Sequence, residues 1–194
     1  MTSAWPVPLV DVDWTPATGV HTAAAALGRT ALLDWCIAVL TGRVVGADPS
    51  TPSLRWIGGA AAGTDEHRDY WARPTVAYWP RVWAARALRY EWEPDAERAV
   101  LAGLQDDAWR VREHCCALAG GHEIADAAAT LAVLAATDQT LRVRRAAITA
   151  LAEVGEVEQA DAIRDALTDL VPAVRQTAEQ ALRRMSERLD RQLD

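Results

Sequence analysis

The densest group of side chains that could do chemistry lies between His114 and His122, where two histidines accompany the adjacent cysteines Cys115 and Cys116. Histidine and cysteine are the usual ligands of structural zinc, and an imidazole beside a thiol is the arrangement found in cysteine nucleophiles. On a helix, however, consecutive side chains point about 100° apart, so His114, Cys115 and Cys116 cannot converge on one ion. We therefore predict no metal site, and we expect His114 and Cys115 to belong to the buried stripe of a helix.

Other catalytic groupings are sparse. A Cys–His nucleophile would need residues that are far apart in the sequence to meet, and no local pattern arranges such a meeting. The glycine-rich stretch 58–63 lacks the spacing of a phosphate-binding loop, and the chain has no lysine. We expect Asp34, an acid in an otherwise apolar segment, to be partly exposed and paired with an arginine rather than catalytic. These features predict a protein that is not an enzyme and has no cofactor.

A third group of ionisable residues recurs at a fixed interval. Three aspartates each precede an arginine by six residues, and a valine stands directly before each arginine: Asp106, Val111 and Arg112; Asp138, Val143 and Arg144; Asp169, Val174 and Arg175. The copies are 32 and 31 residues apart, which is the signature of a stacked repeat array. We expect each aspartate to cap the free backbone N–H groups of the helix that follows it.

Two amphipathic helices complete each copy. After Val143 the apolar residues fall at the i+3, i+4, i+7, i+8 and i+11 positions of a helix, and the other two copies follow closely related patterns. A preceding helix is predicted over 94–105, 124–136 and 157–168, one for each copy. Such helical hairpins bury their Ala/Val/Leu seams only by stacking against one another.

This pattern of Asp, Val-Arg and an Ala/Leu-rich helix resembles the HEAT repeat, in particular the short HEAT-like repeats first noted in phycobilisome lyases. The similarity covers about residues 78–188 and is best in the last two copies. It is degenerate at the N-terminal end, where either Trp79 or Val82 aligns with Val111. The resemblance implies that the Asp–Arg pairs form a ladder between adjacent repeats. We expect each pair to be half exposed and to contribute about 0.5–1 kcal/mol.

The predicted fold is therefore all-α: a right-handed α-solenoid of HEAT-like helical hairpins over residues 76–194, with an N-terminal extension over 1–75 packed on the array. Within the extension we predict a helical segment over 18–41 that is broken at Gly28, and a short helix near 53–62 in a long loop. Residues 1–16 are interpreted as an extended arm anchored by Trp5 and Trp14, or alternatively as a frayed terminus. We interpret the polar tail beyond residue 188 as the fraying end of the last helix, which serves as the far cap of the array.

Aromatic residues crowd the segment between the extension and the first clear repeat. On a helix over 78–90, one face would carry Trp79, Trp83, Arg86 and Tyr90. This face could form an aromatic-walled groove that grips a peptide or a planar ring by stacking and cation–π contacts. Alternatively, the rings could cement the N-terminal helices onto the first repeat, because a terminal repeat needs a cap unlike itself. Both interpretations remain open at this stage.

The composition restricts the partners and the compartment. The net charge of −7 opposes binding to nucleic acid and to anionic lipid, and the 20 arginines partly reflect the codon bias of a GC-rich genome. Three cysteines without a framework spacing indicate a reducing environment. The N-terminus lacks the pattern of a signal peptide, and the apolar segment 31–40 is too short to span a membrane. We therefore predict a soluble, cytoplasmic protein.

The binding surface of a helical solenoid is usually its concave side, which is lined by the second helix of each repeat. We predict an interaction scaffold for a protein or peptide partner with acidic and apolar groups. Its candidate contact residues are Trp79, Trp83, Arg86, Tyr90, Trp109, Arg110, Arg142 and Arg145.

Two alternative functions follow only from the resemblance. DNA glycosylases that act on alkylated bases are also built from HEAT-like repeats, and Asp106, Trp109 and Arg110 are the residues that would serve such a role. The similarity to lyase repeats implies a third hypothesis, an accessory protein that handles a small substrate such as a tetrapyrrole.

Overall fold

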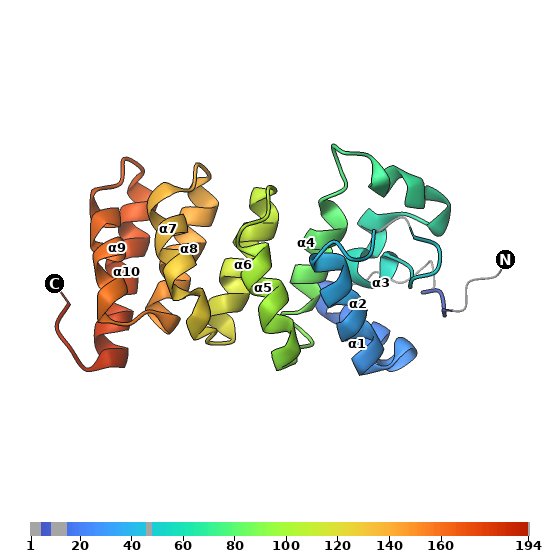
Figure 1. Ribbon diagram of the computed structural model, residues 1–194, viewed down its shortest axis with the longest axis horizontal. Helices are drawn as coiled ribbons and strands as arrows, with labels where there is room; N and C mark the ends of the chain where they lie inside the picture. The colour runs from blue at the N-terminus through green and yellow to red at the C-terminus, as the bar shows by residue number, and fades with distance from the viewer. Residues whose placement is uncertain (1–4, 9–14, 46–47, 194) are drawn as a thin grey trace. The chain divides into compact units, whose positions relative to one another are not determined.

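The computed structural model describes residues 5–8, 15–45 and 48–193 of the 194-residue chain. Across these residues the secondary structure consists of α-helices, 3-10 helices and turns, without a strand, so the prediction of an all-α fold is confirmed. The chain divides into two compact units, residues 1–99 and residues 100–194. Figure 1 labels the helices of both units.

The first unit begins with α1 (Pro16–Leu27) and α2 (Arg29–Leu40). Gly28 separates them at φ +88°, a conformation that L side chains rarely adopt, and the two helix axes differ by 118°. The break expected at Gly28 is confirmed. Asp34 is exposed on α2 and makes no ion pair among the described residues, so its expected pairing with an arginine is wrong. No single described helix is long and apolar enough to cross a membrane, and α1 and α2 reach that length only as a bent pair.

The remainder of the first unit consists of short helices and turns. They are α3 (Arg55–Gly58), the 3-10 helices Gly59–Ala62 and Asp65–Ala72, α4 (Trp79–Ala87) and the 3-10 helix Pro94–Ala96. The helix predicted near 53–62 is therefore present. Trp5 donates a hydrogen bond from its indole Nε1 to the carbonyl oxygen of Ser50 at 2.9 Å, whereas Trp14 lies outside the described residues.

The boundary between the two units falls within α5 in the sequence, and the second unit contains the helical hairpins that the repeats predict. Its helices are α5 (Glu97–Gly103), α6 (Trp109–Gly121), α7 (Ala128–Thr137), α8 (Leu141–Val154), α9 (Ala160–Asp165) and α10 (Pro172–Leu189). A three-residue 3-10 turn directly precedes α5, α7 and α9. The predicted first and second helices of each copy thus agree with the structure. Helices α6, α8 and α10 pack in a row, and α7 packs against α8 and α9.

The seam of the second unit is formed by residues at equivalent positions of α6, α8 and α10. Val111, Val143 and Val174 are each fully buried, as are the residues four positions later, Cys115, Ala147 and Ala178. The fifth position after the valine is buried only in the inner repeats, as Cys116 and Ile148, and is the exposed Glu179 in α10. Helix α8 is covered by α6 and by α10, whereas α10, the last second helix, packs against α8. The buried stripe of α8 is therefore wider than that of α10, and α6 has the same wider stripe.

Three expectations need correction. His114, expected in the buried stripe of α6, is only half buried. The stripe continues through Cys115 and Cys116 instead. The chain beyond residue 188 does not end in a frayed tail, since Leu193 is buried and its carbonyl oxygen accepts a hydrogen bond from Arg164 Nε at 2.9 Å. The repeat aspartates do not cap the first turn of a helix. Each instead accepts a bond from the N–H two residues later, outside the helix, as Asp138 does from Thr140 at 2.8 Å.

Two adjacent glycines near the end of α6 test this packing. A Cβ atom at Gly120 would lie 2.9 Å from Ala150 Cα, whereas one at Gly121 would have no atom within 4 Å. We predict that Gly120→Ala lowers the free energy of unfolding by about 1–3 kcal/mol, because α6 and α8 must separate. Gly121→Ala should leave it unchanged or raise it by about 0.5 kcal/mol through helix propensity. Urea unfolding followed by helical circular dichroism measures both, and equal effects would contradict the close approach of the two helices.

Candidate functional site

The candidate site lies on the outer surface of α6 and α8, which we call the second-helix face. It comprises Trp109, Glu113, Ala117 and Gly121 of α6 together with Arg142, Ala146, Thr149 and Glu153 of α8. Residues three and four positions apart lie on one side of a helix, so each set forms a continuous stripe. Because α6 and α8 pack side by side, the two stripes lie next to each other.

Trp109 forms the N-terminal end of the second-helix face, where its indole lies close to two guanidinium groups. The Cζ atom of Arg110 is 4.3 Å from the ring centroid, and that of Arg142 is 5.9 Å away. Both distances permit cation–π attraction. Arg142 also lies 3.7 Å from the Glu113 carboxylate, yet 66% of its side chain is exposed. Much of this cation therefore remains accessible to another molecule.

A groove of about 500 Å³ occupies the central and C-terminal part of the second-helix face. Its lining residues are small or short in the middle and acidic at the far end: Cys116, Ala117, Gly120, Gly121, Ala146, Thr149, Ala150, Glu123 and Glu153. Glu153 accepts two hydrogen bonds from Arg184 of α10, both at 3.1 Å. The second-helix face thus carries cations and an indole at one end and carboxylates at the other. The positive ends of the α6 and α8 dipoles lie at the cationic end.

A ladder of arginine contacts holds the loops that precede α6, α8 and α10. Arg112 Nη1 donates to the carbonyl oxygen of Asp106 in its own repeat at 2.7 Å, and Arg112 Nε donates to Asp138 Oδ2 of the next repeat at 2.7 Å. Arg144 repeats the arrangement with the Asp138 carbonyl oxygen at 3.1 Å and Asp169 Oδ2 at 2.9 Å. Each carboxylate therefore pairs with the arginine of the preceding repeat rather than with the one that follows it in the sequence.

The ladder pairs are more buried than the sequence indicates. Only 17% of the Arg112 side chain and 3% of the Asp138 side chain are exposed, and both members of the Arg144–Asp169 pair are 15% exposed. The expectation of half-exposed pairs is wrong, because the arginine stems lie between two loops. Burial on its own would raise the pKa of Asp169. The N–H of Val171, with the guanidinium groups of Arg144 and Arg175, outweighs burial and lowers that pKa below its ordinary value.

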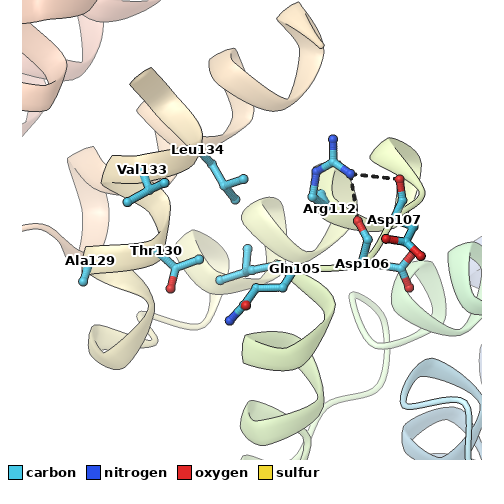
Figure 2. A pocket seen from close by; sticks show the side chains of 9 residues that line it. Gln105, Asp106, Asp107, Arg112, Ala129, Thr130, Val133 and Leu134 are labelled. Atoms are coloured by element: carbon cyan, nitrogen blue, oxygen red, sulfur yellow. Dashed lines mark hydrogen bonds between the residues drawn. The ribbon is translucent and has the colours of Figure 1, made fainter. Parts of the chain in front are cut away.

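A second groove, of about 580 Å³, lies between the loop that precedes α6 and the surface of α7 (Figure 2). Gln105, Asp106, Asp107 and Arg112 form its polar side, and Ala129, Thr130, Val133 and Leu134 come from α7. The Arg112 guanidinium bonds the backbone carbonyl oxygens of Asp106 and Asp107, and Asp106 Oδ1 accepts from the N–H of Ala108. Asp106 is thus held in the loop that precedes α6 by its bonds to Arg112 and Ala108. The structure provides no support for a catalytic role of this residue.

The remaining predicted contact residues lie in the first unit or at the edge of the second-helix face. Trp83 is 2% exposed and contacts Trp71 and Trp79 at centroid distances of 4.8 and 6.2 Å, so its ring belongs to internal packing. Tyr90 is exposed and follows the end of α4. Arg145 donates from Nε to Thr177 Oγ1 at 3.0 Å. The structure therefore brings Trp109, Arg110 and Arg142 together, while Trp83 is inaccessible.

The sequence analysis did not predict the small residues of the groove or the acidic end of the second-helix face. The small residues could have been found from their spacing, because Ala117 and Gly121 follow Glu113 by four and eight residues and therefore lie on the same side of α6.

The cysteines are placed for packing rather than for nucleophilic chemistry. Burial raises the pKa of Cys36 and of Cys116 to about 12, and that of Cys115 well above its ordinary value. The reactive thiolate is therefore scarce at neutral pH. Among the described residues no three His, Cys, Asp or Glu side chains are grouped as metal ligands would be.

Comparison with known proteins identifies one family. Residues 97–183 match the family model described as HEAT repeats, a range that includes α5 to α9 and most of α10. No curated protein and no solved structure gave a match.

Removing one ladder carboxylate tests the contribution of the buried pair. We predict that Asp138→Ala lowers the free energy of unfolding by about 2–4 kcal/mol, because Arg112 loses its charged partner and the Thr140 N–H loses its acceptor. Glu153→Gln, which weakens the more exposed pair with Arg184, should cost less than about 1 kcal/mol. Urea titration of both variants provides the comparison. A cost for Asp138→Ala no larger than that of the control would contradict a stabilising ladder.

The lowered pKa of Asp169 predicts a pH dependence. A carboxyl whose folded-state pKa lies below its unfolded value stabilises the fold above the unfolded value, about 3.9, and this stabilisation is lost as the pH falls through the folded pKa. The stability difference between the wild-type chain and Asp169→Asn should therefore be constant at neutral and weakly acidic pH. It should shrink below about pH 4. Denaturant titrations across this range measure the difference, and a value that is unchanged at pH 3 would exclude the linkage.

Proposed function

Residues 97–183 of this chain belong to the HEAT-repeat family, and from this premise we propose that the chain is a helical-repeat scaffold whose second-helix face binds a protein or peptide partner. The observation that carries the proposal is the placement of Trp109 beside Arg110 and Arg142, with most of the Arg142 side chain exposed. Tryptophan and arginine dominate the energetics of protein interfaces, because they combine a large contact area with directed polar groups.

The charges of the second-helix face define the partner. At the Trp109 end, the exposed guanidinium of Arg142 and the nearby Arg145 favour an acidic group next to an apolar or aromatic one. The groove of small residues can accept an apolar side chain. At its far end the Glu123 carboxylate favours a basic group, whereas Glu153 is paired with Arg184. A partner segment that runs along α6 and α8 is therefore expected to be acidic at one end and basic at the other. The net charge of −7 disfavours nucleic acid as the partner.

Reversing the charge at the cationic end tests the proposal. Peptides selected from a random display library against the full-length chain should be enriched in acidic residues next to aromatic ones. Arg142→Glu combined with Arg145→Glu should weaken their binding at least about tenfold, as measured by fluorescence polarisation, because attraction becomes repulsion. The helical circular dichroism should be unchanged.

The matched control applies the same change in charge away from the second-helix face. Arg183 and Arg191 are exposed, and no side-chain partner is found for either in the described part of the chain. The double change Arg183→Glu with Arg191→Glu should leave the affinity within about twofold of the wild-type value. Equal loss in both double variants would indicate a general charge effect, and no loss in either would exclude the Trp109 end as the binding surface.

A further inference from the structure

A small cavity of about 220 Å³ lies within the first unit, remote in sequence from the proposed binding face. Three segments line it: the first turn of α1 through Thr15, Pro16 and Gly19, residues 56–61 of α3 and the turn that follows, and Arg86 of α4. Among the described lining residues, Arg86 is the only one with a charged side chain. The others contribute backbone, the Thr15 hydroxyl, or apolar side chains such as Trp56 and Ile57.

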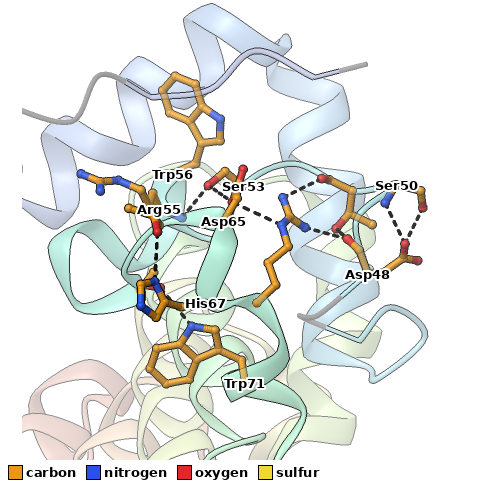
Figure 3. A network of polar contacts seen from close by, with 12 residues as sticks. Asp48, Ser50, Ser53, Arg55, Trp56, Asp65, His67 and Trp71 are labelled. Carbon is orange, nitrogen blue, oxygen red and sulfur yellow. Dashed lines mark hydrogen bonds and ion pairs between the residues drawn. The ribbon is translucent and has the colours of Figure 1, made fainter. Parts of the chain in front are cut away.

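Arg86 is half-buried, and its partners differ from those of Arg68 and of the inner ladder arginines. Arg68, in the 3-10 helix Asp65–Ala72, lies 3.2 Å from the Asp65 carboxylate, within a network that also includes Ser53, Asp48 and Ser50 (Figure 3). The ladder residues Arg112 and Arg144 likewise have carboxylate partners. Arg86 instead donates one hydrogen bond, from Nη2 to the Ile57 carbonyl oxygen at 2.8 Å, and no ion pair is found for it within the described ranges.

The environment of Arg86 favours an added anion. Burial lowers its pKa below the ordinary value, with only a partial opposing effect from Tyr90, so the charged guanidinium is incompletely solvated. A guanidinium has five N–H donors in a planar fork, and the bond to Ile57 uses one of them. Among the described residues no carboxylate pairs with Arg86, and a partly desolvated cation of this kind is stabilised by an anion that can accept from the remaining donors. The first turn of α1 adds a small positive potential on the opposite wall.

We propose that this cavity binds a small monocarboxylate, with the carboxylate on the Arg86 guanidinium and a short apolar body against the remaining walls. The carboxylate matches the planar fork of arginine in a two-point arrangement. A doubly charged phosphate fits less well, because the described lining supplies one cation for its two charges. The cavity volume of about 220 Å³ suits a short-chain acid such as propionate.

Titration of the full-length chain with sodium propionate tests this proposal by nuclear magnetic resonance. The backbone amide of Gly59 and the Nε–H of Arg86 should shift in a saturable manner below about 50 mM. Sodium chloride at equal ionic strength should not reproduce the shifts, and sodium phosphate should bind at least about fivefold more weakly. The absence of a saturable shift in the wild-type chain would overturn the proposal, as would an equal response to chloride or to phosphate.

Three variants locate the site. Arg86→Gln should abolish the saturable shift, whereas Arg89→Gln, an exposed arginine three residues further along the chain, should retain the wild-type dissociation constant. Arg86→Gln also removes a contact to α3, so Ala61→Leu provides a second variant that keeps Arg86 and fills the cavity from its exposed rim. It should weaken propionate binding at least about tenfold. Wild-type binding by Ala61→Leu, or by a folded Arg86→Gln chain, would exclude the cavity.

Discussion

Each inner arginine of the ladder holds two neighbouring loops at once, and the arrangement of the second unit depends on this constraint. Arg112 donates to carbonyl oxygens of its own loop and to the Asp138 carboxylate of the next repeat, and Arg144 does the same with Asp169. The geometry uses different nitrogens of one planar fork, which a lysine ammonium could not reproduce. Helix packing alone would allow neighbouring hairpins to slide along their apolar seams. The ladder fixes the loops, and it thereby fixes where α6 and α8 begin relative to each other.

The starting points of these helices determine what the second-helix face presents. Trp109 is three residues before Arg112, and Arg142 is two residues before Arg144, so both belong to the first turns that the ladder aligns. Their 5.9 Å separation therefore follows from the register of the repeats. Further along, the close approach of Gly120 to Ala150 produces the shallow groove with small walls. The surface that we propose for a partner is thus built from residues that individually pack or pair.

Much of the second unit was predictable because a helix repeats its apolar positions with a fixed period. The interval between Asp106, Asp138 and Asp169 predicted the hairpins and their approximate ends. The partner of each ladder arginine was not predictable from within one copy, because the pairing crosses to the next repeat. The burial of Cys116 also depends on a neighbouring helix. The sequence gives one sign of this, because the corresponding residue of the last repeat is the charged and exposed Glu179. The cavity at Arg86 joins three segments separated by more than twenty residues, and local patterns carry no information about such meetings.

The dependence of the second unit on its ladder is tested most directly by a double-mutant cycle on Arg144 and Asp169. Unfolding free energies of Arg144→Ala, Asp169→Ala and the double variant separate the interaction between the two side chains from their other contacts. A stabilising coupling energy of at least about 1 kcal/mol at neutral pH is predicted, because both side chains are largely buried and share two hydrogen bonds. A coupling within about 0.3 kcal/mol of zero would contradict a ladder that holds the repeats in register.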